Sequence, residues 1–214
     1  MRERISRVSQ ETRGIWSKAH LAVNEAQLMR RTVQAQVEEL CEDKEFRRRY
    51  RDGMLCRILR AAIVATHAGM GNIQIFNPQS GDLQILVHEG FHNPFLYHFR
   101  SVKPGDAACG QALKSRDRVV VEDVTDSAVF AGDPSMEILL DAGVRAVQST
   151  PLIGSQGQSL GVFSTHYPVP RRPTDADLRT LDYFSRWAAA LLEWHDYGGL
   201  PPGRAHGQEL SHAS

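Results

Sequence analysis

The sequence is poor in several features that define common classes of protein. It has only three cysteines, at the irregular positions Cys41, Cys56 and Cys109, which argues against a disulfide framework or a structural zinc site. It has no apolar run of about 18 residues, so no membrane-spanning helix is expected. Lys+Arg and Asp+Glu number 25 each, so no net charge favours nucleic acid or an anionic membrane surface.

The amino-terminal stretch is charged and has no apolar segment behind it, which does not fit a secretory signal. Together with the few cysteines, this favours a reducing, cytoplasmic setting. What the sequence does contain is enough for a folded core, because 42% of its 214 residues are hydrophobic. That length suits one domain of ordinary size plus an accessory element.

The accessory element is expected at residues 1–43, as a helix. Apolar or small residues recur there at heptad spacing, at Ile5, Val8, Thr12, Ile15, Ala19, Ala22, Ala26, Met29, Val33, Gln36 and Leu40. This is the narrow stripe of a two-helix seam, and such a helix needs a partner surface to be stable. Either it lies on its own domain or two copies pair as a coiled-coil homodimer, which is the interpretation we favour.

Residues 44–196 show a different order of patterns and are predicted to form the main domain. Helical periodicity comes first, with a bend expected at Gly53, and a long helix capped by Thr174 closes the domain. Two hairpins are predicted between these helices, at residues 72–88 and 145–167, and a single strand at 118–124. Short helices are predicted at residues 93–100, 106–115 and 133–144. Tight turns between neighbouring strands imply a mainly antiparallel sheet, and hence an α+β domain. Residues 197–214 have little to bury and are expected to be a disordered tail.

This order of elements resembles the GAF domain family of bacterial signalling proteins. The segments that carry the resemblance are GNIQIFNPQSGDLQIL, RVVVEDV, GVRAVQSTPL, SLGVFSTHY and TDADLRTLDYFSRWAAALLE. The match as a whole runs from about Phe46 to Trp194. The likeness is greatest to GAF modules in or beside two-component sensor kinases. It implies a mainly antiparallel sheet with long terminal helices on one face and short helices or loops over a pocket on the other.

The resemblance also implies a function. Members of the family are generally non-catalytic; they bind a small molecule or chromophore in the pocket and pass the effect through their terminal helices to an output partner. The sequence shows no kinase, cyclase or DNA-binding output module of its own. We therefore expect the signal to reach another chain, such as a histidine kinase.

Candidate ligand-binding residues follow from the resemblance and from strand alternation. Asn72 and Gln74 share one face of the first strand, and Ser164 and His166 share one face of the last. Buried amides and hydroxyls need hydrogen-bond partners, which a ligand, a trapped water or the neighbouring backbone can supply. The opposite face, toward the terminal helices, is expected to be apolar.

Aromatic residues and one cysteine complete the candidate set. Phe91 and Phe95 are placed to stack on a ligand or, with Phe99, to fill the pocket of a module that no longer binds one. Cys109 lies in the short helix over the pocket side. It is either a small buried residue or the centre of a thiol-based redox sensor or small redox enzyme. The sequence identifies neither the ligand nor a cofactor.

Several specific activities of the family do not match these residues. GAF proteins that reduce free methionine sulfoxide use several cysteines around the pocket, whereas Cys41 and Cys56 fall in the N-terminal helices. Cyclic-nucleotide-binding members carry an Asn-Lys…Phe…Asp-Glu pattern after the last strand, of which only Asp175 is present. Tetrapyrrole-binding members usually have His after the attachment cysteine, but Cys109 is followed by Gly110.

Other kinds of site are not indicated. His88, His92 and His98 are close in sequence, but no carboxylate or cysteine completes a metal-binding set. The basic run FRRRYR directly follows the acidic run EELCEDKE, which favours ion pairs along a helix over nucleic-acid binding. No Ser-His-Asp order, phosphate-binding loop or pair of carboxylates stands out, so we expect neither enzyme activity nor a resident metal.

Overall fold

The computed structural model describes residues 23–197, and the chain divides into two compact units, 1–43 and 44–214. In the first unit, residues 23–42 form one α-helix, which agrees with the helical prediction for this part of the heptad stripe. The stripe residues Met29, Val33 and Leu40 are exposed on it. The earlier heptad positions, up to residue 22, lie outside the described residues. So does the predicted tail, apart from its first residue, which ends the last helix.

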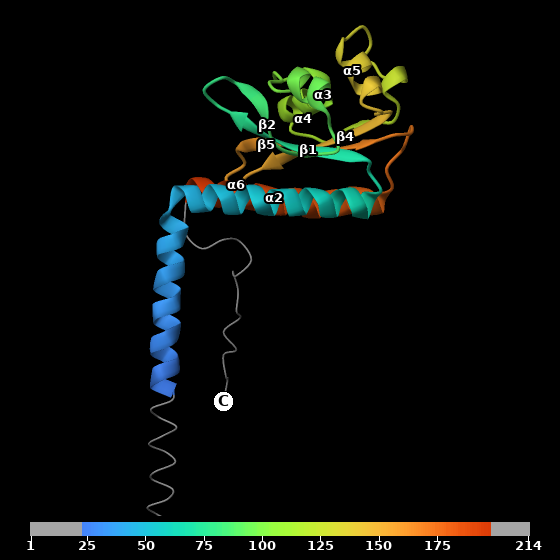
Figure 1. Cartoon of the computed structure of the whole chain (residues 1–214). Coiled ribbons are helices and arrows are strands. Elements are labelled where there is room, and N and C mark those ends of the chain that lie inside the picture. Colours follow the sequence, from blue (N-terminus) through green and yellow to red (C-terminus); the bar gives the residue numbers. More distant parts are fainter. Residues whose placement is uncertain (1–22, 198–214) are drawn as a thin grey trace, which may run out of the picture. The chain divides into compact units, whose positions relative to one another are not determined.

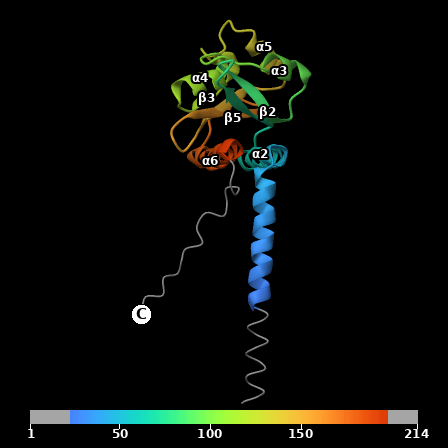
Figure 2. The same ribbon diagram turned by 90° about the vertical axis from the view of Figure 1, so that its left-hand side faces the viewer.

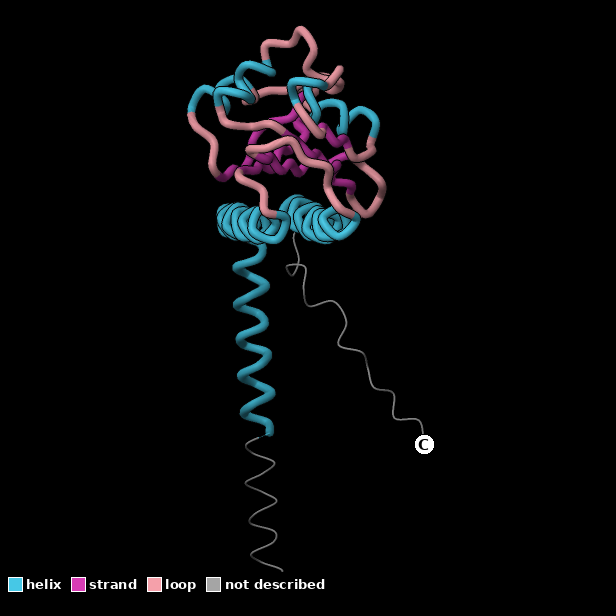
Figure 3. Tube along the Cα trace, turned by 90° about the vertical axis from the view of Figure 1, so that its right-hand side faces the viewer, coloured by secondary structure: helices cyan, strands magenta, loops and turns pink. Residues whose placement is uncertain are grey.

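A five-stranded sheet forms the centre of the second unit, with the order β2-β1-β5-β4-β3 and antiparallel pairing throughout. The strands are β1 (Met70–Asn77), β2 (Asp82–Glu89), β3 (Val119–Val121), β4 (Ala146–Ile153) and β5 (Ser159–Tyr167). The two predicted hairpins are confirmed as β1–β2 and β4–β5, and pairing of β5 with β1 joins them. Figure 3 shows the strands as one layer between two layers of helix, the predicted α+β arrangement.

Two long helices lie side by side on one face of the sheet (Figures 1 and 2). They are α2 (Lys44–Thr66) and α6 (Asp175–Tyr197). α6 begins with a capping box, in which Thr174 Oγ1 accepts from the Asp177 N–H at 3.2 Å and Asp177 Oδ2 accepts from the Thr174 N–H at 2.9 Å. α2 runs unbroken through Gly53, so the bend predicted there is wrong, and helical structure is interrupted at Asp43 instead. One glycine costs a helix only about 1 kcal/mol, which burial of side chains such as Leu55 offsets.

Short helices cover the opposite face of the sheet (Figure 2). They are α3 (Asn93–His98), α4 (Ala107–Ser115), the 3-10 turn η1 (Val124–Asp126) and α5 (Ser135–Asp141). Their apolar side chains and those of the sheet form one buried cluster, which includes Phe95, Val121, Phe130, Leu139 and Val147. The predicted division, with long helices on one side and short elements on the other, is therefore confirmed.

The sheet face toward the long helices is less apolar than predicted. Thr150 lines a surface hollow together with Ser185 of α6, and Gln148 and Thr165 are buried on the same face. Gln148 Nε2 donates to Thr150 Oγ1 at 3.0 Å, and the Thr165 and Tyr167 hydroxyls are 3.2 Å apart. Residues two apart on a strand lie on the same face, so these side chains bond to each other, but Gln148 Oε1 and Ser185 Oγ are buried there without a partner.

Candidate ligand-binding pocket

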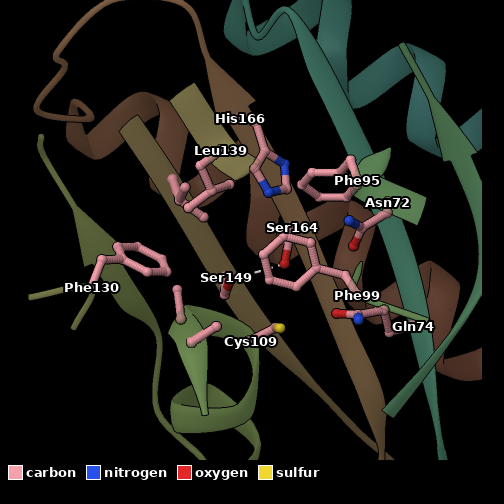
Figure 4. A pocket seen from close by; sticks show the side chains of 13 residues that line it. Asn72, Gln74, Phe95, Phe99, Cys109, Phe130, Leu139, Ser149, Ser164 and His166 are labelled. Atoms are coloured by element: carbon pink, nitrogen blue, oxygen red, sulfur yellow. Dashed lines mark hydrogen bonds between the residues drawn. The ribbon is translucent and has the colours of Figure 1, made fainter. Parts of the chain in front are cut away.

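A small cavity lies between the sheet and the short helices that cover it (Figure 4). Its volume is about 20 Å³, which is room for about one water molecule. Side chains from β1, β4 and β5 line it on one side, and α3, α4 and α5 contribute the other side. Six of the seven predicted ligand-binding residues line it: Asn72, Gln74, Phe95, Cys109, Ser164 and His166.

The strand register explains why the polar residues converge. Asn72 of β1 lies opposite Ser164 of β5, and Ser164 lies opposite Ser149 of β4 on its other side. Alternate residues of a strand share a face, so Gln74 and His166 lie on the same side of the sheet as this row. Alternation alone shows that Asn72 and Gln74 share a face of β1 and that Ser164 and His166 share a face of β5. Pairing of β1 with β5 places all four on the same side of the sheet.

Aromatic rings close the cavity on the α3 side. Phe95 and Phe99 line it, with their ring centroids 4.5 Å apart. The seventh predicted residue, Phe91, does not line it but stacks behind Phe95 at a centroid distance of 3.7 Å. The His166 ring meets Phe91 and Phe95 edge-on, at 4.9 and 5.7 Å. These rings fill much of the space beneath α3, which accounts for the small volume of the cavity.

The polar groups of the cavity differ in whether the protein satisfies them. Ser149 Oγ and Ser164 Oγ are 2.8 Å apart and bond to each other. In contrast, Asn72 Oδ1, both polar atoms of the Gln74 carboxamide, and His166 Nδ1 are buried without a hydrogen-bond partner. Each such group costs roughly 1–3 kcal/mol of stability. The cavity therefore holds hydrogen-bonding capacity that the protein itself does not use.

Burial also sets the protonation states in the cavity. Loss of hydration lowers the pKa of His166 to about 3, so its imidazole is neutral at physiological pH. Burial likewise raises the pKa of the Cys109 thiol to about 11, against smaller opposing effects of backbone groups and the Gln74 side chain. Cys109 is therefore a protonated thiol, which is the unreactive form.

The backbone is strained where α4 meets the cavity. Ala107, a lining residue, has φ of 49°, in the left-handed region that residues other than glycine seldom occupy. Strain of this kind persists only where the surrounding contacts impose it, and it is concentrated at binding and catalytic sites. Ala107 and the two residues that follow it, Ala108 and Cys109, all line the cavity.

Some lining residues have no clear signal in the sequence. Phe130 is only 1% exposed, but it lies in the irregular segment before α5, where no periodicity marks an inward position. Leu139 comes from α5, whose packing onto the cavity depends on the tertiary fold. Ser149 does carry a signal, as a hydroxyl in the middle of a predicted strand. Only the pairing of β4 with β5 shows that it faces the cavity.

The histidines of β2 and α3 do not form a metal site. Between residues 23 and 197, no group of three or more His, Cys, Asp or Glu side chains is placed to hold a metal ion. His98 instead bonds to Ser135, with Nε2 and Oγ 2.9 Å apart, and so links α3 to α5 above the cavity. Over the same part of the chain, no helix has both the length and the apolar character needed to cross a membrane.

Fold and cavity together define a class of protein module: an antiparallel sheet with paired long helices behind it and a covered pocket in front. The family model for the GAF domain matches residues 51–193, and the chain belongs to this family. The resemblance inferred from the sequence is thereby confirmed. GAF domains are typically sensory or regulatory modules.

Solved structures share this fold at low sequence identity. A domain assigned to a two-component sensor histidine kinase of Sinorhizobium meliloti is 20% identical, with a TM-score of 0.56, over 66% of this chain and 89% of that one. A GAF domain region from a protein of Geobacter sulfurreducens, assigned as a membrane protein, is 13% identical, with a TM-score of 0.59, over 69% and 95%. Free methionine-R-sulfoxide reductase of Neisseria meningitidis, solved with its substrate, is 17% identical, with a TM-score of 0.56, over 78% and 89%. At these identities the likeness establishes the fold alone, and no curated protein matches the chain in sequence.

Proposed function

We propose that this GAF domain is a non-catalytic sensory module that binds a small molecule in the cavity and signals through its terminal helices to a partner chain. The observation that carries the proposal is the set of buried polar atoms without partners on Asn72, Gln74 and His166, all around one cavity. Apolar residues at these positions would make the domain more stable. A ligand that bonds to the polar groups explains why they are there.

Binding is expected to require movement of the cover. A cavity of about 20 Å³ admits a water molecule but not a metabolite. The cover includes α3, a helix of six residues that contributes Phe95 and is tied to α5 through the bond between His98 and Ser135. A helix this short has little stability of its own, so displacing it costs less than deforming the sheet.

The sheet offers a route from the cavity to the long helices. Asn72 and Gln74 line the cavity, whereas the intervening Ile73 is on the opposite, helix-facing side. β1 and α2 are in close contact, because a Cβ at Gly71 would lie 2.9 Å from Leu59 Cδ1. A shift of β1 on binding is therefore expected to displace α2. A coupling of about 1–3 kcal/mol between pocket and helix is enough for regulation.

The N-terminal helix is the proposed output element. Its stripe residues Met29, Val33 and Leu40 are 70%, 52% and 50% exposed, and their heptad spacing suits a second copy of the same helix. We infer a cytoplasmic homodimer that pairs along this stripe. A displacement of α2 would then reach the helix that precedes it in the chain, and through it a partner such as a histidine kinase of a two-component system.

The alternative function, a thiol-based redox sensor or small redox enzyme centred on Cys109, has less support. Cys109 as a residue is only 8% exposed, and burial raises the pKa of its thiol to about 11, which suppresses the thiolate that redox chemistry needs. Cys56 lies on α2, on the other side of the sheet, and neither cysteine is in a disulfide. A sensor that recognises a ligand by hydrogen bonds fits the cavity better.

Native mass spectrometry of the freshly purified full chain tests the proposal. We expect the wild type to retain a small molecule that Gln74→Leu does not retain. Gln148→Leu is the matched control, because Gln148 is also a buried glutamine of the same sheet but lies on the face toward α6. If no preparation retains a molecule and no fraction of a cell extract raises the melting temperature, the ligand-binding function is wrong.

A further inference from the structure

The cavity wall contains hydrogen-bonding groups but no charged side chain. No Asp, Glu, Lys or Arg lines it. Its two titratable residues, His166 and Cys109, are both held in their neutral forms by burial. A charged ligand would thus lose its hydration without gaining a counter-charge, which disfavours its binding.

A carboxylate near the cavity further disfavours negatively charged ligands. Asp106, at the start of α4, acts electrostatically on the Cys109 thiol and opposes its ionisation. A negatively charged ligand beside Cys109 would be opposed by the same carboxylate. The aromatic rings offer no clear compensation for a cation, because Phe91, Phe95 and Phe99 are packed against one another and do not surround a common centre.

The unused polar atoms define the groups that a ligand must carry. Asn72 Oδ1 and Gln74 Oε1 accept hydrogen bonds, Gln74 Nε2 donates them, and Nδ1 of the neutral His166 ring does either according to its tautomer. A complementary molecule therefore has both N–H donors and a carbonyl-type acceptor. The rings of Phe95 and Phe99 on the α3 side favour a flat molecule, since aromatic faces stack on planar groups.

On the basis of the proposed function, we infer that the ligand is a small, flat and uncharged molecule with amide-like hydrogen-bonding groups. Carboxamides, lactams and neutral nitrogen heterocycles fit this description. Carboxylates, phosphorylated metabolites and zwitterionic amino acids do not. The inference rests on the composition of the cavity wall and on the orphaned atoms of the β1 carboxamides. Together they favour a ligand that is polar but uncharged.

Three probes of nearly the same shape test the charge preference directly. Benzamide is neutral, benzoate is an anion and benzamidine is a cation at pH 7.5, and all three have one phenyl ring with a planar substituent. Calorimetric titration of the full chain is expected to show benzamide binding at least about tenfold more tightly than either charged probe. Benzamide is also expected to change the NMR shifts of the Asn72 and Gln74 side-chain amide protons.

Two variants place the binding in the cavity. Gln74→Leu removes the orphaned carboxamide and is expected to weaken benzamide binding about tenfold, while Gln148→Leu on the opposite sheet face leaves it unchanged. Asn72→Leu serves as a second cavity variant if Gln74→Leu does not fold, as judged by circular dichroism.

The outcomes separate this inference from the proposed function. If benzoate or benzamidine binds as tightly as benzamide and is weakened by Gln74→Leu, the cavity binds ligands but the inferred neutrality is wrong. If none of the three probes binds, the inferred ligand class is wrong, and the ligand-binding function is then decided separately by native mass spectrometry. Equal binding of benzamide to the wild type and both cavity variants also overturns the inference, because binding would lie elsewhere.

Discussion

Ser149 Oγ and Ser164 Oγ lie 2.8 Å apart across the β4–β5 pair, and one hydroxyl donates a hydrogen bond to the other on the cavity side of the sheet. Hydroxyls in the middle of a sheet therefore do not by themselves indicate a ligand here. The orphaned atoms belong instead to Asn72 and Gln74 of the neighbouring strand, β1, and to His166 of β5. Within one polar row, the protein stabilises one part internally and leaves another part unpaired.

This pairing predicts coupled stability effects. Ser149→Ala or Ser164→Ala alone leaves one buried hydroxyl without its partner, and we expect each to destabilise the domain by about 1–2 kcal/mol. The double variant removes both groups, so its effect should be smaller than the sum by about 1 kcal/mol. Urea denaturation of the four proteins in a double-mutant cycle measures this coupling. Strictly additive effects would show that the two hydroxyls do not depend on each other.

We expect the Gln74 side chain to lower the stability of the empty domain while it serves ligand binding. Replacing its orphaned carboxamide with the similarly sized apolar side chain of Gln74→Leu should stabilise the empty domain by about 1 kcal/mol. Gln148→Leu should not, because it breaks the bond from Gln148 to Thr150. The two glutamines lie on opposite faces of the sheet, and only Gln148 has a side-chain hydrogen bond to lose. Thermal and urea unfolding in buffer without added ligand give the comparison, and a destabilised Gln74→Leu would mean that Gln74 already has a partner.

The sequence was sufficient for the fold and for six of the thirteen residues that line the cavity, and particular residues show why. Strand alternation assigned Asn72 and Gln74 to one face, and Thr174 as the capping residue marked the start of α6, because both signals are local. Phe130 has no such signal, since its burial comes from tertiary packing of an irregular segment. Gly53 illustrates the opposite error: a residue of low helix propensity is held in α2 by packing against the sheet.

The exposed heptad stripe predicts a dimer that charge substitution would dissociate. Met29→Glu combined with Val33→Glu places four like charges in a two-helix seam, and we expect the full chain to change from dimer to monomer. Leu28→Glu is the control, because Leu28 is as exposed as Met29, at 67% against 70%, but lies outside the stripe. Light scattering measures the mass of each protein. A wild type that is monomeric at high concentration would exclude the seam.

Cys109 is predicted to react slowly in the folded protein. With its pKa raised to about 11, its thiolate is scarce at neutral pH, so alkylation by iodoacetamide should be at least about a hundredfold slower than in the unfolded chain. Peptide mapping resolves it from Cys56, which is half-buried. Cys109→Ser should leave the response to oxidants unchanged. Rapid modification of Cys109 in the native state would restore the redox alternative.

His166 predicts a loss of stability in mild acid. Its pKa is about 3 in the folded protein, against 6.5 for an unperturbed histidine, so below pH 6.5 the unfolded chain takes up a proton that the folded protein cannot. Stability therefore falls as the pH falls, and between pH 7 and pH 5 this one residue should account for about 2 kcal/mol.

The measurement is the free energy of unfolding in urea at several pH values, for the wild type and His166→Gln. We expect the variant to lose about 2 kcal/mol less than the wild type between pH 7 and pH 5, because it has no imidazole to protonate on unfolding. His88→Gln, at an exposed position of the same sheet, is the control and should keep the wild-type slope. Identical slopes in all three proteins would mean that His166 is hydrated or paired in the folded state. The conclusion that the cavity wall is uncharged would then no longer hold at His166.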